Sequence, residues 1–192
     1  IQTLLGLEEG VQVLDLSNKQ IDPGQAKILA TEIRLRRVTA GIVSLNCLAN
    51  HFGDEGLATL LTAIEGTSVR SLCGLTEGQT TADFSGQGLG PIDCKIMKAE
   101  FDFCGFIAAV ESIDLSGCGL AGATKTKWNG QEYVWEKIDS NMDGFIALCT
   151  VLGKVRTVRL ADCGLGARST AELAKVFRDA DAALTKLDVR SN

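Results

Sequence analysis

The sequence has few of the residues on which most kinds of catalytic or metal site depend. Its 192 residues include one histidine, His51, and aromatic residues make up only 5% of the chain. A lone histidine argues against the mixed cysteine and histidine ligand sets that bind zinc. The sequence also has no nucleophile elbow and no phosphate-binding loop of the Walker type. We therefore predict a protein that is not an enzyme and has no cofactor, and we interpret His51 as a variable loop residue.

An excess of positive charge and long apolar runs are also missing. The chain has 19 Lys and Arg against 24 Asp and Glu, a formal net charge of -5, which gives no general attraction to nucleic acid. No apolar run approaches the roughly 18 residues that a membrane-spanning helix needs. We predict no nucleic-acid partner and no membrane span. Arg34, Arg36 and Arg37 form a local basic cluster, so peripheral contact with lipid head groups or an acidic partner stays open beside an ordinary solvated helix face.

Cysteine is more frequent than histidine, but its pattern does not suggest a disulfide framework. The seven cysteines are Cys47, Cys73, Cys94, Cys104, Cys118, Cys149 and Cys163. Their number is odd, no two of them form a C-x-x-C pair, and most fall at positions expected to be buried. We therefore predict reduced thiols and an intracellular location, without resolving the compartment.

What the chain does contain is an internal repeat of the form L-x-x-L-x-L-x-x-[N/C]-x-L. Copies begin at residues 11, 42, 79, 110, 155 and 184, and the clearest run from Val110 to Leu120 and from Val155 to Leu165. The uneven spacing indicates insertions after the second and fourth copies. A longer repeat with an offset of 68 residues relates Leu4 to Leu72 and Pro23 to Pro91, so the N-terminal part looks like a duplicated pair of repeats.

The template has a direct structural meaning. Alternate residues of x-L-x-L-x form a short strand whose leucines point inward, and the Asn or Cys that follows turns the chain and binds buried backbone groups. Residues 54–64 and 169–177 are apolar at helical spacing, so each unit reads as strand, turn and helix. We predict strands near residues 13–17, 44–48, 82–84, 112–116, 157–161 and 186–190. The residues expected to be buried are Leu14, Leu16, Leu45, Cys47, Phe84, Ile113, Leu115, Val158 and Leu160.

The chain resembles the ribonuclease-inhibitor-like class of leucine-rich repeats, on the strength of this template and of the loop sequence Asn50-His-Phe-Gly-Asp-Glu-Gly-Leu57. The resemblance implies an α/β solenoid of about six repeats over residues 1–192, with a curved parallel sheet inside and helices outside. The resemblance is specific for fold and not for function, so a role in holding other proteins is an expectation from this repeat class. We expect neither terminal repeat to be a polar cap, and hence a fragment of a longer chain.

The outward strand positions predict a partner-binding row on the concave face. The row consists of Asp15, Asn46, Asp83, Asp114, Arg159 and Asp188. Adjacent strands are about 4.8 Å apart, so unpaired acids at this spacing repel each other unless a cation lies against them. A partner bearing Lys or Arg would relieve the repulsion, and a merely solvated polar face is the alternative.

Residues 121–140 form an insertion that reads as a β-hairpin with Asn129-Gly130 as a two-residue turn. That turn would pair Trp128 with Gln131 and place Trp128, Tyr133 and Trp135 on one face. Because Trp and Tyr are enriched at binding hot spots, these three residues are candidate partner contacts. The alternative is that the aromatic face packs on the protein's own flank.

The insertion ends in a motif that resembles the start of an EF-hand loop. Asp139, Asn141 and Asp143 have the spacing of calcium ligands, and Gly144 follows at the turn position. The twelfth position, where a glutamate is needed, is Thr150. We therefore favour a turn that caps the next helix and keep calcium as a weak candidate.

These features together predict a non-catalytic protein-interaction or scaffold module, a subunit of a larger assembly whose partners are other proteins. The second hypothesis is a regulatory leucine-rich-repeat protein such as a GTPase activator, because related repeat proteins include such activators. Nothing in the sequence identifies residues for that activity. Stimulated GTP hydrolysis would favour it, and stable co-purification with a complex would favour the scaffold.

Overall fold

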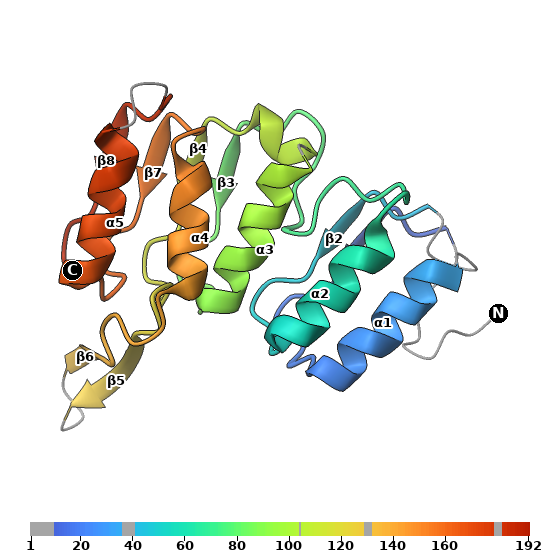
Figure 1. Cartoon of the computed structure of the whole chain (residues 1–192), viewed down its shortest axis with the longest axis horizontal. Coiled ribbons are helices and arrows are strands. Elements are labelled where there is room, and N and C mark those ends of the chain that lie inside the picture. Colours follow the sequence, from blue (N-terminus) through green and yellow to red (C-terminus); the bar gives the residue numbers. More distant parts are fainter. Residues whose placement is uncertain (1–9, 36–40, 104, 129–131, 179–181) are drawn as a thin grey trace. The chain divides into compact units, whose positions relative to one another are not determined.

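The computed structural model describes residues 10–35, 41–103, 105–128, 132–178 and 182–192. Within them the chain is a mixed α/β protein with five α-helices, one 3-10 helix and eight strands (Figure 1). The helices are α1 (Pro23–Leu35), α2 (Gly53–Ile64), α3 (Pro91–Asp102), α4 (Asp143–Leu152) and α5 (Ala167–Arg178), with the 3-10 helix at Phe106–Ala109. The strands are β1 (Val13–Asp15), β2 (Ser44–Asn46), β3 (Thr81–Asp83), β4 (Ser112–Asp114), β5 (Thr124–Trp128), β6 (Glu132–Glu136), β7 (Thr157–Arg159) and β8 (Lys186–Asp188). Among these residues no helix has the length and apolar character needed to cross a membrane.

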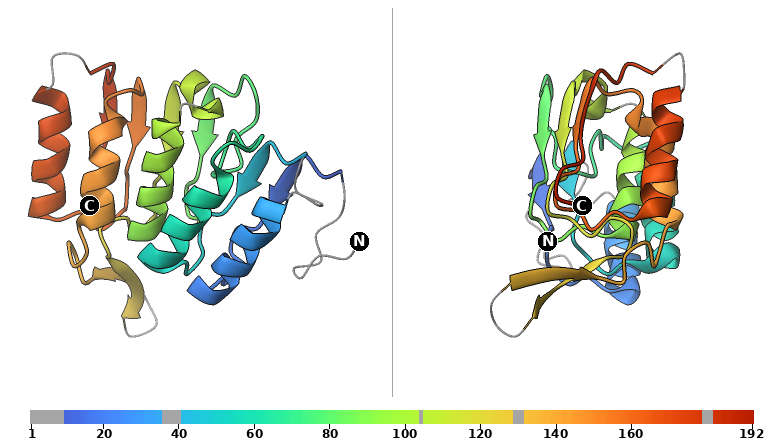
Figure 2. Two further views of the ribbon diagram at one scale, coloured as in Figure 1. Left: turned by 45° about the vertical axis from the view of Figure 1, so that its right-hand side comes forward. Right: turned by 90° about the vertical axis from the view of Figure 1, so that its left-hand side faces the viewer.

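The chain divides into two compact units. The first comprises Ile1–Glu77 with Ala99–Ala108, and the second Gly78–Lys98 with Ala109–Asn192. In the first unit β1 pairs in parallel with β2, and α1 packs against α2 on one side of the two strands (Figure 2). The second unit has a four-stranded parallel sheet in the order β3-β4-β7-β8, with α4 packed against α5.

All six predicted core strands are present, and each is shorter than predicted or equal in length. Their inward residues alternate with outward residues that are polar except for the exposed Val13 of β1, and Leu45, Ile113 and Val158 are almost completely buried. The other residues expected in the core are also buried, with two exceptions: Leu14 and Leu16 are only half-buried. Both belong to the segment of β1, which pairs with β2 and with no other strand of the described residues.

The 68-residue offset is confirmed by the positions of the elements. It separates Val13 from Thr81 at the first residues of β1 and β3, and it separates Pro23 from Pro91 at the first residues of α1 and α3. Proline suits the first helical position because its missing N–H has no partner there and its φ is already helical. Before α1, the carboxylate of Asp22 accepts the N–H of Gln25 at 2.8 Å while the Gln25 side chain accepts the N–H of Asp22, a reciprocal cap.

The Asn position of the template holds the turn after the strand with side-chain hydrogen bonds. Asn50 is buried, accepts the N–H groups of Lys19 and Ile21, and donates to the carbonyls of Leu16, Cys47 and Leu48. Asn192 makes the same five-bond pattern in the second unit, with Cys163, Leu165, Leu160, Val189 and Arg190. This satisfies backbone groups that a turn would otherwise bury without partners.

At the equivalent positions, cysteine also contacts backbone carbonyl groups of the preceding repeat. The thiol of Cys118 lies 3.4 Å from the carbonyl oxygen of Phe84, and that of Cys163 lies 3.2 Å from the carbonyl oxygen of Leu115. A thiol is a weak donor and a weak acceptor, and the Cys118 sulfur also accepts from the backbone N–H groups of Leu89 and Gln87, so cysteine keeps the pattern of asparagine with weaker bonds. The six cysteines in the described part of the chain are buried and form no disulfide bond with one another, and Cys104 lies outside that part.

The first of the two predicted insertions contains a further strand-like segment that the sequence did not reveal. Ser71 and Cys73 form isolated bridges to Ser44 and Asn46 of β2. The N–H groups of Leu72 and Cys73 donate to Oε2 of the buried Glu100, at 2.5 and 3.0 Å. Burial raises the pKa of Glu100 above its ordinary value, against the opposing effect of the hydrogen bonds from this segment. Glu100 thus binds backbone N–H groups of this segment together with the local hydroxyl of Ser71, which accepts the N–H groups of Cys73 and Leu75.

Candidate partner-binding surface

The outward row of the second unit is assembled as the repeat predicted. The Cα atoms of Asp83, Asp114, Arg159 and Asp188 are direct partners across the parallel sheet. Asp15 and Asn46 are paired in the same way in the first unit. The row is therefore a real geometric feature within each unit, although its chemistry differs from the predicted one.

The acids of the row are used first by their own backbone. Oδ1 of Asp83 accepts the N–H of Ser85 at 3.0 Å, and Oδ1 of Asp114 accepts the N–H of Ser116 at the same distance. Asp15, Asn46 and Asp188 accept the N–H two residues later in the same manner. Each side chain thus closes a turn of the Asx type at the end of its strand, which explains why Asp and Asn recur here. For Asp83, hydrogen bonds from Ser85 lower the pKa of the carboxyl.

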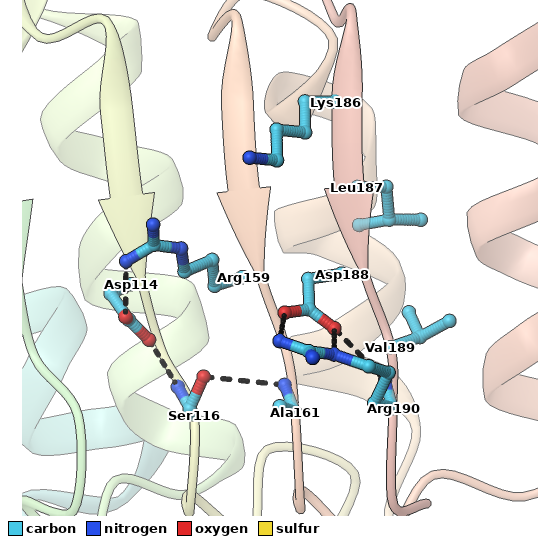
Figure 3. Close-up of a pocket in the computed structure, with 9 residues that line it drawn as sticks. All are labelled: Asp114, Ser116, Arg159, Ala161, Lys186, Leu187, Asp188, Val189 and Arg190. Carbon is cyan, nitrogen blue, oxygen red and sulfur yellow. Dashed lines mark hydrogen bonds and ion pairs between the residues drawn. The ribbon is translucent and has the colours of Figure 1, made fainter.

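Arg159 is the member of the row in the second unit that cannot close such a turn. The N–H of Ala161, two residues later, instead donates to Oγ of Ser116 on the neighbouring strand, at 3.3 Å (Figure 3). The guanidinium of Arg159 lies 3.4 Å from Oδ2 of Asp114. An arginine at a position where the other strands of this sheet have aspartate therefore places a cation inside the acidic row.

A second cation binds the last acid of the row. The guanidinium of Arg190 binds both oxygens of Asp188, with Nε at 2.9 Å and a terminal nitrogen at 2.6 Å (Figure 3). Hydrogen bonds from Arg190, aided by the charge of Arg159, lower the pKa of Asp188 to about 2. The protein's own arginines thus relieve the electrostatic repulsion expected between aspartates of adjacent strands. No basic partner is needed to relieve this repulsion.

These side chains line a shallow hollow of about 770 Å³ on the outward side of β4, β7 and β8. Lys186 completes its wall and was not singled out from the sequence (Figure 3). The available signal was its register position beside Thr157, which lies two residues before Arg159 on the same face of the sheet.

The inserted hairpin is present, but its register differs by one residue from the predicted one. β5 and β6 are antiparallel, and Trp128 is opposite Glu132 rather than Gln131. The connection is therefore one residue longer than a two-residue turn, and residues 129–131, including the predicted Asn129-Gly130 turn, lie outside the described part. A one-residue slip exchanges the two faces of one strand relative to the other. The expectation that Trp128 shares a face with Tyr133 and Trp135 was wrong for this reason, and the side chain of Trp128 is not described.

The described aromatic residues of the hairpin behave differently from each other. Nε1 of Trp135 donates to Oδ1 of Asp162 at 2.8 Å, and the ammonium of Lys125 lies 5.1 Å from the Trp135 ring and 2.5 Å from Oδ2 of Asp162. Trp135 also lies against Gly164, where a Cβ would be 2.7 Å from the indole. Tyr133, by contrast, is 60% exposed. Trp135 anchors the hairpin to the segment of Asp162 and Gly164 within the second unit, while Tyr133 stays a candidate partner contact.

The motif that resembled a calcium loop has a structural use. Asp139 accepts hydrogen bonds from the N–H groups of Gly166 and Arg168 and from the hydroxyl of Ser169, at the beginning of α5. Burial alone would raise the pKa of Asp139, but these hydrogen bonds outweigh it and lower the pKa. The motif thus caps α5, a helix 27 residues further on, whereas the predicted cap was of the next helix. Asp143 is the first residue of α4, and the N–H of Asn141 donates to the carbonyl of Ala121.

The described residues contain no group of three or more His, Cys, Asp and Glu side chains placed to hold a metal ion. His51 is exposed at the end of its loop, and of the basic cluster only Arg34 is described. Comparison of the sequence with protein-family models and with curated proteins gives no match. The residues and their geometry are therefore the basis for the function proposed below.

Proposed function

We propose that this chain is a leucine-rich-repeat solenoid of the ribonuclease-inhibitor-like class and that it acts as a protein-interaction module. In this proposal the outward face of its parallel sheet holds another protein, and the chain is a subunit of a larger assembly. The equal strand registers, the matching bonds of Asn50 and Asn192, and the 68-residue offset support the repeat class.

The observation that carries the functional proposal is the ordered outward face of β3, β4, β7 and β8. The helices α4 and α5 lie on the other side of these strands, so the face is open (Figure 2). Hydrogen bonds to the backbone fix the carboxylates of this face before any partner arrives. Side chains that are already ordered lose little conformational entropy on binding, which favours a specific contact.

Site-specific photocrosslinking in extracts of the native source tests the proposal. A photoreactive residue at Thr157, on the sheet face, should form an adduct with one protein partner. The same residue at Ala174, which is exposed on α5, is the matched control on the helical side and should form none. Adducts from Ala174 alone would place the interface on the helices and contradict the proposal.

A further inference from the structure

The hollow on β4, β7 and β8 is not predominantly acidic, although the outward row predicted from the sequence consists mostly of aspartates. Its lining contains the two acids Asp114 and Asp188 and the three cations Arg159, Lys186 and Arg190. The acids are less accessible, with side chains 22% and 14% exposed, whereas Arg159 is 50% and Arg190 83% exposed. A molecule that approaches this part of the face therefore meets positive charge first.

Two of the cations have donors left for a ligand. Arg159 uses one terminal nitrogen on Asp114 at the long distance of 3.4 Å, and a guanidinium has five N–H donors. Lys186 is exposed, and no interaction of its ammonium is drawn in Figure 3. Asp188 is directly opposite Arg159, and Lys186 lies two residues before Asp188 on β8. Lys186 is therefore the diagonal neighbour of Arg159 in the sheet. Such neighbours are about 7–8 Å apart and long side chains bridge that distance.

We propose that this hollow binds an acidic segment of the partner protein, with Asp or Glu carboxylates placed between Arg159 and Lys186. This proposal rests on the protein-interaction function proposed above and reverses the chemistry expected from the sequence, which was a Lys- or Arg-bearing partner. Guanidinium groups match carboxylates in geometry as well as charge. A nucleic acid fits less well, because its continuous phosphate backbone would extend beyond the three cations of the hollow over a protein of net charge -5, whereas a short acidic segment needs only these cations.

The repeat itself supplies the variant that tests the proposal. Arg159→Asp gives β7 the residue that β3, β4 and β8 have in this row, and Lys186→Thr gives β8 the residue that β3 and β7 have at the first position of the strand. The introduced aspartate can close the turn with the N–H of Ala161 as its neighbours do. The double variant should therefore fold, and circular dichroism of the whole chain checks this. Lys175→Thr, on α5, is a control that also removes a positive charge from the second unit.

The probe is a fluorescein-labelled peptide of alternating glutamate and serine, compared by fluorescence polarisation with peptides that have glutamine or lysine in place of glutamate. The natural chain should bind the glutamate peptide best, with affinity that falls as salt rises. The double variant should weaken this binding about tenfold or more, and the Lys175→Thr variant should leave it unchanged.

Three results would overturn the inference: preference for the lysine peptide, equal binding by the natural chain and the double variant, or no binding of the glutamate peptide. Binding of a single-stranded oligonucleotide by Arg159 and Lys186 without binding of the glutamate peptide would assign the hollow to nucleic acid instead. The photocrosslink from Thr157 separates the two proposals. If it forms while the glutamate peptide does not bind, the sheet face still holds a protein but not through this acidic contact.

Discussion

Replacing Asn50 tests whether one side chain of the repeat stabilises two neighbouring turns. Asn50→Ala removes five hydrogen bonds, two accepted and three donated, between 2.8 and 3.2 Å long. Each buried hydrogen bond contributes about 1 kcal/mol net, and a buried group left without a partner costs about 1–3 kcal/mol. Because several of these backbone groups can reach water after small shifts, we expect a loss of about 3–5 kcal/mol in the free energy of unfolding.

The chain offers two matched comparisons for this experiment. Asn50→Cys installs the residue that occupies the equivalent position at Cys118, where the thiol contacts a carbonyl of the preceding strand segment. It should keep part of the donated bonds and lose about half as much stability as Asn50→Ala. Asn192→Ala removes the same set of five hydrogen bonds, which here is made by an exposed side chain. Its bonds are part-buried or exposed rather than fully buried, so water replaces most of them and the loss should be about 1 kcal/mol.

Urea unfolding followed by far-UV circular dichroism measures all three losses. Tryptophan fluorescence gives a second signal for the second unit, because both tryptophans belong to that stretch of the sequence. The expected order of stability is natural chain, Asn192→Ala, Asn50→Cys and Asn50→Ala. Equal losses for Asn50→Ala and Asn192→Ala would show that burial of the bonds does not matter. The argument from unsatisfied backbone groups would then be refuted.

Further predictions concern the other buried or capping groups. The pKa of Glu100 is raised, so its contribution to stability is present below its unfolded pKa and is lost as pH rises through the folded value. Glu100→Gln should remove this pH dependence in urea unfolding measured between about pH 4 and 8; an unchanged pH profile would mean that Glu100 is not the responsible group. The pKa of Asp139 is lowered, so its contribution is present above its unfolded pKa and is lost as pH falls through the folded value. Asp139→Ala should cost about 1–2 kcal/mol and speed amide hydrogen exchange in the first turn of α5, while unaltered exchange there would contradict the capping role. Trp135→Ala should lower the melting temperature by the equivalent of about 2 kcal/mol, because its ring packs and donates within the second unit; lost partner affinity at an unchanged melting temperature would instead make it a binding residue. Burial raises the pKa of Cys149 and of Cys163 to about 12, so iodoacetamide at about pH 8 should label them only after unfolding, as mass spectrometry can measure.

The hairpin shows how a correct local pattern can give an incorrect surface. Alternation and the Asn-Gly pair located both strands, but the register depends on the length of the connection, and one added residue changed which side chains share a face. Similarly, the template predicted the row of Asp15, Asp83 and Asp114 and treated its acids as unpaired. It could not include the backbone N–H groups that those acids accept.

The sequence by itself determined the mixed α/β class and the position of every core strand, because both depend on short-range periodicity. Alternating apolar residues, Asn or Cys at a fixed offset, and proline at the start of α1 and α3 are local signals that neighbouring residues enforce. Only the tertiary structure decided the roles of residues whose partners are remote in the chain. Asp139 caps a helix 27 residues away, and Glu100 binds a segment 28 residues before it. The charge presented by the sheet face was decided in the same way, since Arg159 meets Asp114 across 45 residues of sequence. The repeat predicted which strands are adjacent, but which atoms of their side chains and backbone bind each other depends on the three-dimensional geometry of the turns and strands.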